Sequence, residues 1–136
     1  MAQNLESFFE ELALSKMRKE MKKHEFLVAK AQDDLLGFIV YEIKNQNVCE
    51  ILWIAIKKEE RNKGLGTALM NELEYIIEEK DVRLLMVKTL ADEIEYEPYR
   101  YTRLFYRNKG FFHIETIEPY PGWTVGNPCA IYVKVL

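Results

Sequence analysis

Apolar residues recur along the chain at two different spacings, and each spacing predicts a different kind of element. Near the N-terminus, Leu5, Phe8 and Leu12 lie three to four residues apart, which predicts a helix over residues 4–14. A second short helix is expected after Ser15, whose hydroxyl can cap the first turn. The chain is therefore expected to open with helical structure.

Further along, the pattern changes to short segments rich in β-branched and aromatic residues. Residues 26–31 and 35–43 flank the polar pair Asp33-Asp34, an arrangement that predicts a β-hairpin. The next strand is predicted over residues 48–57, and its second half is apolar on both faces, which is typical of a strand in the middle of a sheet. Burial on both sides implies helices above and below the sheet.

The clearest amphipathic helix lies in the middle of the chain, where glutamates occupy the outer face. Its apolar positions are Ala68, Leu69, Leu73, Ile76 and Ile77. Beyond it, residues 82–90 predict a strand, and Thr102 can cap a short helix that Gly110 closes. Residues 111–118 and 129–135 predict the last two strands.

The predicted order of elements is ααβββαβαββ, and it occupies a single domain of residues 1–136. Strands that alternate with helices in this way indicate an α/β fold with a mixed, mostly antiparallel sheet. The irregular loop between the last two strands contains Pro121, Gly122, Gly126 and Pro128.

Composition is that of an ordinary soluble globular domain, with 49% hydrophobic and 30% charged residues. The longest apolar segments are far shorter than the roughly 20 residues that cross a bilayer. The N-terminal segment is too acidic for a signal peptide. A cytoplasmic location without a membrane partner is therefore expected.

Charge and cysteine usage exclude two further classes of partner. The net charge of −3 gives no general attraction to nucleic acid. Cys49 and Cys129 both lie in apolar strand-like segments, where a free cysteine behaves as a small hydrophobe. Neither cysteine has ligand-like spacing with His24 or His113, so no metal site is expected.

A glycine-containing loop, residues 61–66 with the sequence RNKGLG, joins the central strand to the amphipathic helix. The N-terminus of a helix exposes unpaired N–H groups and carries about half a positive charge, so such a loop can hold phosphate oxygens. Gly64 and Gly66 leave the backbone open to a ligand. A dinucleotide-binding loop would need Gly or Ala in place of Leu69, and a Walker loop would need Lys-Ser/Thr after the second glycine. Neither pattern fits.

The loop matches the R/Q-x-x-G-x-G/A motif of GNAT acetyltransferases, and residues 105–111 resemble the later F-Y-x-x-x-G-F signature of that family. Both motifs stand in the family's order, and the resemblance covers nearly the whole chain from Phe26 onward. It implies the GNAT fold, in which two central strands splay apart, and acetyl-CoA as the co-substrate of an N-acetyltransferase.

The resemblance also implies which residues hold acetyl-CoA. The pantetheine arm would pair with the backbone of Ile54, Ala55 and Ile56. The residues implied around the pyrophosphate are Arg61, Asn62, Lys63, Gly64, Leu65, Gly66 and Thr67.

The chain departs from the family in two places. Tyr99 stands where many relatives have an asparagine that contacts the cofactor. The family's first strand is also hard to find, so we expect six or seven strands, with one edge strand missing in the shorter case.

Two residues are expected to serve the chemistry. In the family, the tyrosine at the position of Tyr106 is the usual general acid, although full proton transfer from a phenol to a thiolate is uphill by about 2 kcal/mol. The alternative is a core aromatic beside Phe105. Glu50 aligns with the glutamate base of lysine acetyltransferases, and its apolar chain neighbours would strengthen it as a base. Otherwise Glu50 lies at the start of its strand and meets solvent.

The acceptor site is expected opposite the cofactor, between residues 92–101 and the loop 120–123. Carboxylates interleaved with tyrosines there attract a cationic amine, unless the segment is only a solvated loop. The residues chosen as acceptor contacts are Glu93, Tyr96, Tyr99 and Trp123. The acceptor is expected to be a small-molecule amine or a protein amino group. A homodimer is left open, and the rival function is a non-catalytic acyl-CoA-binding module.

Overall fold

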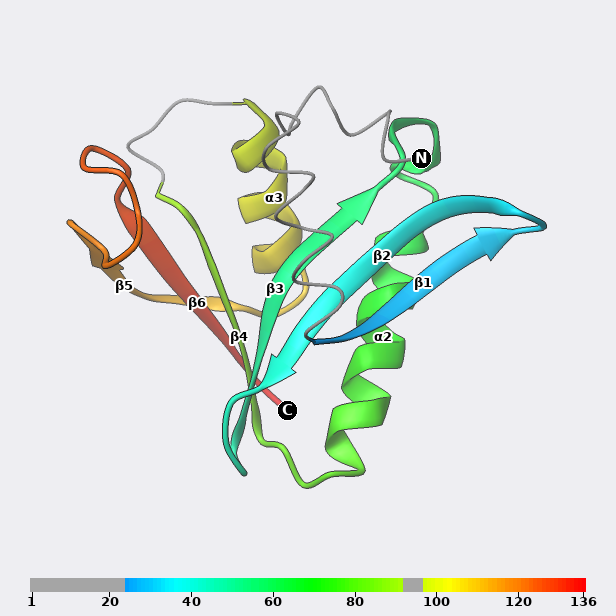
Figure 1. Cartoon of the computed structure of the whole chain (residues 1–136), viewed down its shortest axis with the longest axis horizontal. Helices are drawn as coiled ribbons and strands as arrows, with labels where there is room; N and C mark the ends of the chain where they lie inside the picture. Colours follow the sequence, from blue (N-terminus) through cyan, green and yellow to red (C-terminus); the bar gives the residue numbers. More distant parts are fainter. Residues whose placement is uncertain (1–23, 92–96) are drawn as a thin grey trace.

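The computed structural model describes residues 24–91 and 97–136, in which six strands form one mixed sheet (Figure 1). The strands are β1 (Glu25–Ala31), β2 (Asp34–Ile43), β3 (Val48–Ile56), β4 (Leu84–Leu90), β5 (Phe112–Ile117) and β6 (Cys129–Val135). The helices are the short 3-10 helix η2 (Lys58–Glu60) and the α-helices α2 (Leu65–Glu78) and α3 (Glu97–Asn108). The helices predicted over residues 4–14 and after Ser15, and any first edge strand, lie outside the described residues. None of the described helices is long and apolar enough to span a membrane.

The sequence pattern predicted the order of the described elements, and β6 has the predicted bounds. The predicted start of α3 was wrong: the helix begins at Glu97, five residues before Thr102. Pro98 explains the difference, because proline fits the first turn of a helix, where its missing N–H is not needed. Part of the segment that was expected to be an acceptor loop is therefore helical.

The sheet has the order β1-β2-β3-β4-β6-β5, and β3 with β4 is its one parallel pair. That pair is short: it runs from Val48 opposite Leu84 to Ile51 opposite Val87. Beyond these residues β3 pairs only with β2, and β4 pairs only with β6, so the two central strands diverge (Figure 1). The divergence begins at a β-bulge, because Leu52 is an extra residue in the register between β3 and β2. Bulges bend the strand that contains them.

Both described α-helices cover the same face of the sheet (Figure 1). The side chains that α2 buries join Tyr106 of α3 in one hydrophobic core with residues of β2, β3, β4 and β6. Those of α2 are Leu69, Met70, Leu73 and Ile77. Cys49 and Cys129 are free and buried, as their apolar surroundings predicted. Helices on the opposite face stay a prediction, because the segments expected to supply them lie outside the described residues.

Candidate functional site at the divergence of β3 and β4

The N-terminus of α2 leaves its first amides open. The first backbone hydrogen bond of the helix runs from the N–H of Ala68 to the carbonyl oxygen of Gly64, at 3.0 Å. The N–H groups of Leu65, Gly66 and Thr67 therefore have no acceptor within the helix. Gly64 is the N-cap and makes no side-chain cap, and the first turn contains no acidic residue. The partial positive charge of the helix end is thus left for an external anion.

Glycine is needed at each of the two loop positions for a different structural reason. Gly64 has a left-handed φ of 84°, and a Cβ there would meet nothing within 4 Å, so the space beside it is open. At Gly66 a Cβ would lie 3.1 Å from the ring of Phe105. Gly66 therefore allows α3 to pack closely against α2, a long-range contact that the local sequence did not predict.

The rest of the loop is a turn that adds positive charge beside the helix end. Asn62 also has a left-handed φ, of 64°, a conformation that asparagine tolerates better than most residues. Arg61 is half-buried, and the exposed Lys63 ammonium lies 3.9 Å from the Glu60 carboxylate. The structure thus brings the predicted pyrophosphate residues together at one helix end.

The end of β3 presents backbone hydrogen-bonding groups to the divergence. The Lys57 N–H donates to the Leu36 carbonyl at 2.8 Å, and so points toward β2. Successive N–H groups along an antiparallel strand point to opposite sides, so those of Ile54 and Ile56 point away from β2. No strand within residues 24–91 or 97–136 pairs with this edge beyond Ile51. Within the part of the chain that the structure describes, the backbone edge at Ile54–Ile56 is therefore unpaired on its β4 side.

Tyr106 lies on α3 and is buried, with 2% of its surface exposed. Its ring centroid is 5.7 Å from that of Phe105 and 5.2 Å from that of Phe111. Burial raises the pKa of the Tyr106 phenol above its ordinary value. A phenol with a raised pKa gives up its proton less readily, so the environment favours a neutral hydrogen-bond donor over a full proton donor.

Glu50 occupies a setting that neither sequence-based alternative described. The residue is only 4% exposed, so it does not simply meet solvent. Its two carboxylate oxygens lie 3.0 Å from the Lys44 ammonium and 3.2 Å from the Lys88 ammonium. The expectation of an apolar setting was therefore wrong, because the ammonium groups of Lys44, in the turn after β2, and Lys88, on β4, reach the carboxylate. The carboxylate is therefore engaged by two ammonium groups at once.

Lys88 connects Glu50 to the loop between β5 and β6. Its ammonium lies 5.0 Å from the centre of the Tyr120 ring, and Tyr120 in turn packs edge-on against Trp123 at 5.7 Å. Burial alone would lower the pKa of Lys88, but the Tyr120 side chain and the Glu50 carboxylate outweigh it, and the pKa is raised. The structure thus brings the predicted residues Glu50 and Trp123 into one cluster through a lysine that the sequence reasoning missed. One signal was available, because Lys88 is the only charged residue in the apolar β4 segment.

The remaining predicted acceptor contacts are not located. Glu93 and Tyr96 lie outside the described residues, and of Tyr99 only the backbone in α3 is described. Next to this segment stands a second residue that was missed, the buried Arg103. Its guanidinium donates to the Ala91 carbonyl oxygen at 3.4 Å, which ties α3 to the end of β4.

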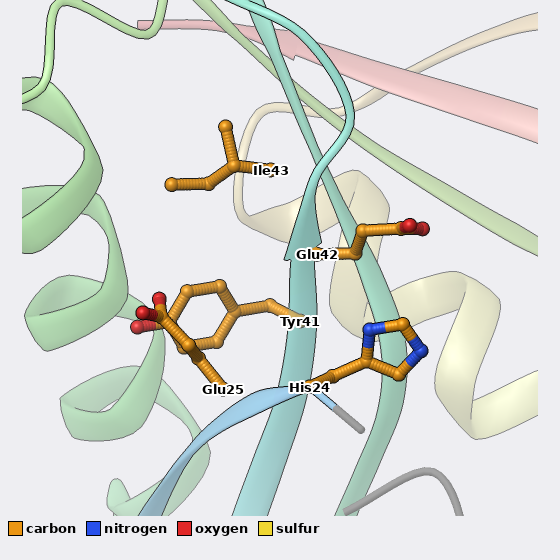
Figure 2. A pocket seen from close by; sticks show the side chains of 5 residues that line it. All are labelled: His24, Glu25, Tyr41, Glu42 and Ile43. Atoms are coloured by element: carbon orange, nitrogen blue, oxygen red, sulfur yellow. The ribbon is translucent and has the colours of Figure 1, made fainter.

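One surface depression lies apart from both the start of α2 and the residues around Glu50 and Lys88. It has a volume of about 200 Å³ and is lined by His24, Glu25, Tyr41, Glu42 and Ile43. Figure 2 shows Tyr41 and Glu25 on one side of β2, with His24 and Glu42 on the other. Burial, together with a hydrogen bond and charge from Glu25, raises the pKa of Tyr41 to about 12. Tyr41 pairs with Ile51, so the depression lies beside the paired half of β3 and not at the divergence.

The divergence separates two chemically different faces of the sheet. Adjacent residues of a strand point to opposite faces. Val87 belongs to the core with Tyr106, on the face covered by α2 and α3. Lys88, the next residue, pairs with Glu50 on the other face. A molecule inserted between β3 and β4 would have open helix amides near one end and could meet a second reactant from the Glu50 side.

Comparison with known proteins shows which family and which solved structures the chain resembles. Residues 2–111 match the model of the acetyltransferase (GNAT) family. No curated protein sequence matches the chain.

Several solved structures share the fold. A protein from Desulfovibrio desulfuricans assigned to the GNAT family is 22% identical, with a TM-score of 0.82 over 94% of this chain and 84% of that one. The aminoglycoside 6'-N-acetyltransferase from Enterococcus faecium is 18% identical, with a TM-score of 0.75 over 98% and 86%. A GNAT family acetyltransferase from Elizabethkingia anophelis, solved with acetyl-CoA bound, is 18% identical, with a TM-score of 0.72 over 93% and 85%. At these identities the likeness shows the shared fold.

The Lys44–Glu50–Lys88 cluster predicts an asymmetric response to mutation. Lys44→Met with Lys88→Met leaves a buried carboxylate without a counter-charge, and we expect a loss of about 3–5 kcal/mol in the free energy of unfolding at pH 7. Glu50→Gln leaves ammonium groups whose side chains are still 37% and 21% exposed, so its cost should be only about 1–2 kcal/mol. Urea unfolding of both variants measures the difference.

The triple variant, with all three substitutions, is the matched control. It should recover most of the loss of the double-lysine variant, because no buried charge remains. Equal losses for Glu50→Gln and for the double-lysine variant would contradict the buried ion-pair description.

Proposed function

The chain belongs to the acetyltransferase (GNAT) family, and from that premise we propose that it is an acetyl-CoA-dependent N-acetyltransferase. It moves the acetyl group to a primary amine, which attacks directly while both reactants are bound. The observation that carries the proposal is the divergence of β3 from β4 beside the open N-terminus of α2. One feature accepts an extended chain and the other accepts its phosphates.

The described residues fit acetyl-CoA at three places. The amides at the start of α2 and the open space beside Gly64 suit the pyrophosphate. The outward N–H groups of Ile54 and Ile56 suit the amide groups of the pantetheine arm. Arg61 and Lys63 add positive charge next to the phosphates. Tyr99 in place of the asparagine common in the family remains a departure, and its side chain is not described.

The residues of the chain act on the reaction by donating hydrogen bonds at fixed positions. Bound acetyl-CoA supplies an acetyl group that is activated as a thioester. One of the two outward N–H groups, that of Ile54 or of Ile56, can donate to the acetyl carbonyl oxygen as negative charge develops there, which leaves the other for the pantetheine arm. Tyr106 can donate to the leaving group, and because burial raises the pKa of the phenol, it acts as a neutral donor.

We place the acceptor amine on the Glu50 side of the divergence, between β3, β4 and the loop around Trp123. A carboxylate offers about four lone-pair sites. Two ion pairs leave Glu50 able to accept a hydrogen bond from an amine or from an intervening water. Glu93, Tyr96 and Tyr99 stay in the proposal as acceptor contacts. The aminoglycoside named for the Enterococcus faecium protein is one amine to test, alongside amino acids and protein N-termini.

The proposal includes a cytoplasmic location, in keeping with two free, buried cysteines. The competing function, an acyl-CoA-binding module without turnover, differs in one observable: it binds acetyl-CoA but releases no thiol with any amine.

Gly64→Asp should weaken acetyl-CoA binding by about tenfold or more, because a carboxylate placed beside the helix N-terminus repels the pyrophosphate. Calorimetric titration of the folded variant measures the dissociation constant. Gly126→Asp is the matched control, because Gly126 also has a left-handed φ, of 93°, and no atom within 4 Å of a Cβ. That control should bind acetyl-CoA like the parent. Parent-like affinity of Gly64→Asp would exclude this loop as the phosphate site.

Tyr106→Phe should lower kcat about ten- to a thousandfold while acetyl-CoA affinity stays within about twofold, because the hydroxyl acts on the leaving group. Thiol release from acetyl-CoA with a panel of amines measures kcat, and the same assay on the parent tests the enzyme against the binding module. Tyr75→Phe, at a tyrosine of α2 that is 63% exposed, is the control and should behave like the parent. An unchanged kcat in Tyr106→Phe would make Tyr106 only a core residue.

A further inference from the structure

Thr89 of β4 buries a polar atom. The residue is 5% exposed, and its hydroxyl oxygen is fully buried with no hydrogen-bond partner among the residues that the structure describes. A buried hydroxyl left unsatisfied costs roughly 1–3 kcal/mol of stability, so such groups are uncommon in folded proteins. Valine has nearly the same shape and would avoid that cost. The stability of the fold therefore does not explain why position 89 carries a hydroxyl group.

The position of Thr89 in the sheet suggests a role for this hydroxyl in ligand binding. The last residue of β4 that pairs with β3 is Val87, so Thr89 stands two residues into the divergence. Side chains two apart on a strand share a face. Val87 and Ala91, on either side of Thr89, both belong to the core that contains Tyr106. Thr89 is therefore on the helix-covered face, in the part of β4 that no longer pairs with β3.

We propose that the Thr89 hydroxyl is a positioning group for acetyl-CoA that donates a hydrogen bond to a carbonyl oxygen of the pantetheine arm. This inference rests on the proposed function, because the arm must lie between β3 and β4. The edge of β3 can supply backbone groups from one side of the opening, and Thr89 supplies a side-chain donor from the β4 side. A carbonyl oxygen of the arm would accept the hydrogen bond that the Thr89 hydroxyl does not make within the described residues.

The test uses two substitutions with opposite chemistry. Thr89→Val removes the hydroxyl and keeps the shape, and Thr89→Ser keeps the hydroxyl. Without ligand, Thr89→Val should melt at the parent's temperature or above it, because an unsatisfied buried group is removed. Its affinity for acetyl-CoA should nevertheless fall about tenfold, the equivalent of about 1.4 kcal/mol. Thr89→Ser should retain most of the affinity.

A truncated ligand locates the contact. The nucleotide half of CoA, 3′-phospho-ADP, lacks the pantetheine arm, so the parent and Thr89→Val should bind it equally well in a calorimetric titration. Thr116→Val is the matched control, because it makes the same change in β5, where the hydroxyl is already bonded to His113 at 2.8 Å. Its affinity for acetyl-CoA should match that of the parent.

The failure of this inference differs from the failure of the proposed function. If the parent and Thr89→Val bind acetyl-CoA equally well, the hydroxyl makes no hydrogen bond to the ligand. In that case only this inference is wrong. Equal weakening of acetyl-CoA and of 3′-phospho-ADP would also overturn it, since the effect would not come from the arm. A parent protein that binds neither ligand would refute the proposed function itself.

Discussion

The parallel pairing of β3 with β4 ends after four residue pairs, and the rest of the site depends on that early end. A parallel pair in the middle of a sheet normally continues along both strands, because every unpaired N–H and C=O inside a protein costs free energy. Here the Leu52 bulge bends β3, and each strand keeps its other neighbour, β2 or β6. The sheet remains whole, while beyond Ile51 and Val87 the facing edges of β3 and β4 no longer pair with each other.

The opening lies between two environments that suit different reactants. On the covered face, the free amides of α2, the buried Tyr106 and the unsatisfied Thr89 hydroxyl are all hydrogen-bond donors. On the other face, Glu50 is held between Lys44 and Lys88, so its charge is compensated within the protein. A primary amine that approaches from this side meets a carboxylate already engaged with cations. This arrangement disfavours a third full positive charge beside Lys44 and Lys88, and it suits an amine that arrives neutral or becomes neutral.

Short-range patterns predicted much of the fold, including the turn that opens α2. The hairpin, the amphipathic α2, the β6 bounds and the loop after β3 all follow from spacing and glycine placement within a few residues. The acceptor side depends on contacts across the sheet, which local spacing does not reveal. Glu50 was assigned an apolar setting because its chain neighbours are apolar, yet Lys88 reaches it from β4. The packing role of Gly66 against Phe105 was missed for the same reason.

Amide hydrogen exchange followed by NMR measures most directly whether acetyl-CoA enters the opening between β3 and β4. The Ile54 and Ile56 amides face the opening, whereas the amide of Ala55, between them, faces β2 and serves as an internal control. Saturating acetyl-CoA should slow exchange at Ile54, Ile56 and the first amides of α2, and leave Ala55 and the strand β1 unchanged. Protection that is absent from β3 and α2, or that appears instead around Tyr41, would contradict the assignment of this opening as the acetyl-CoA site.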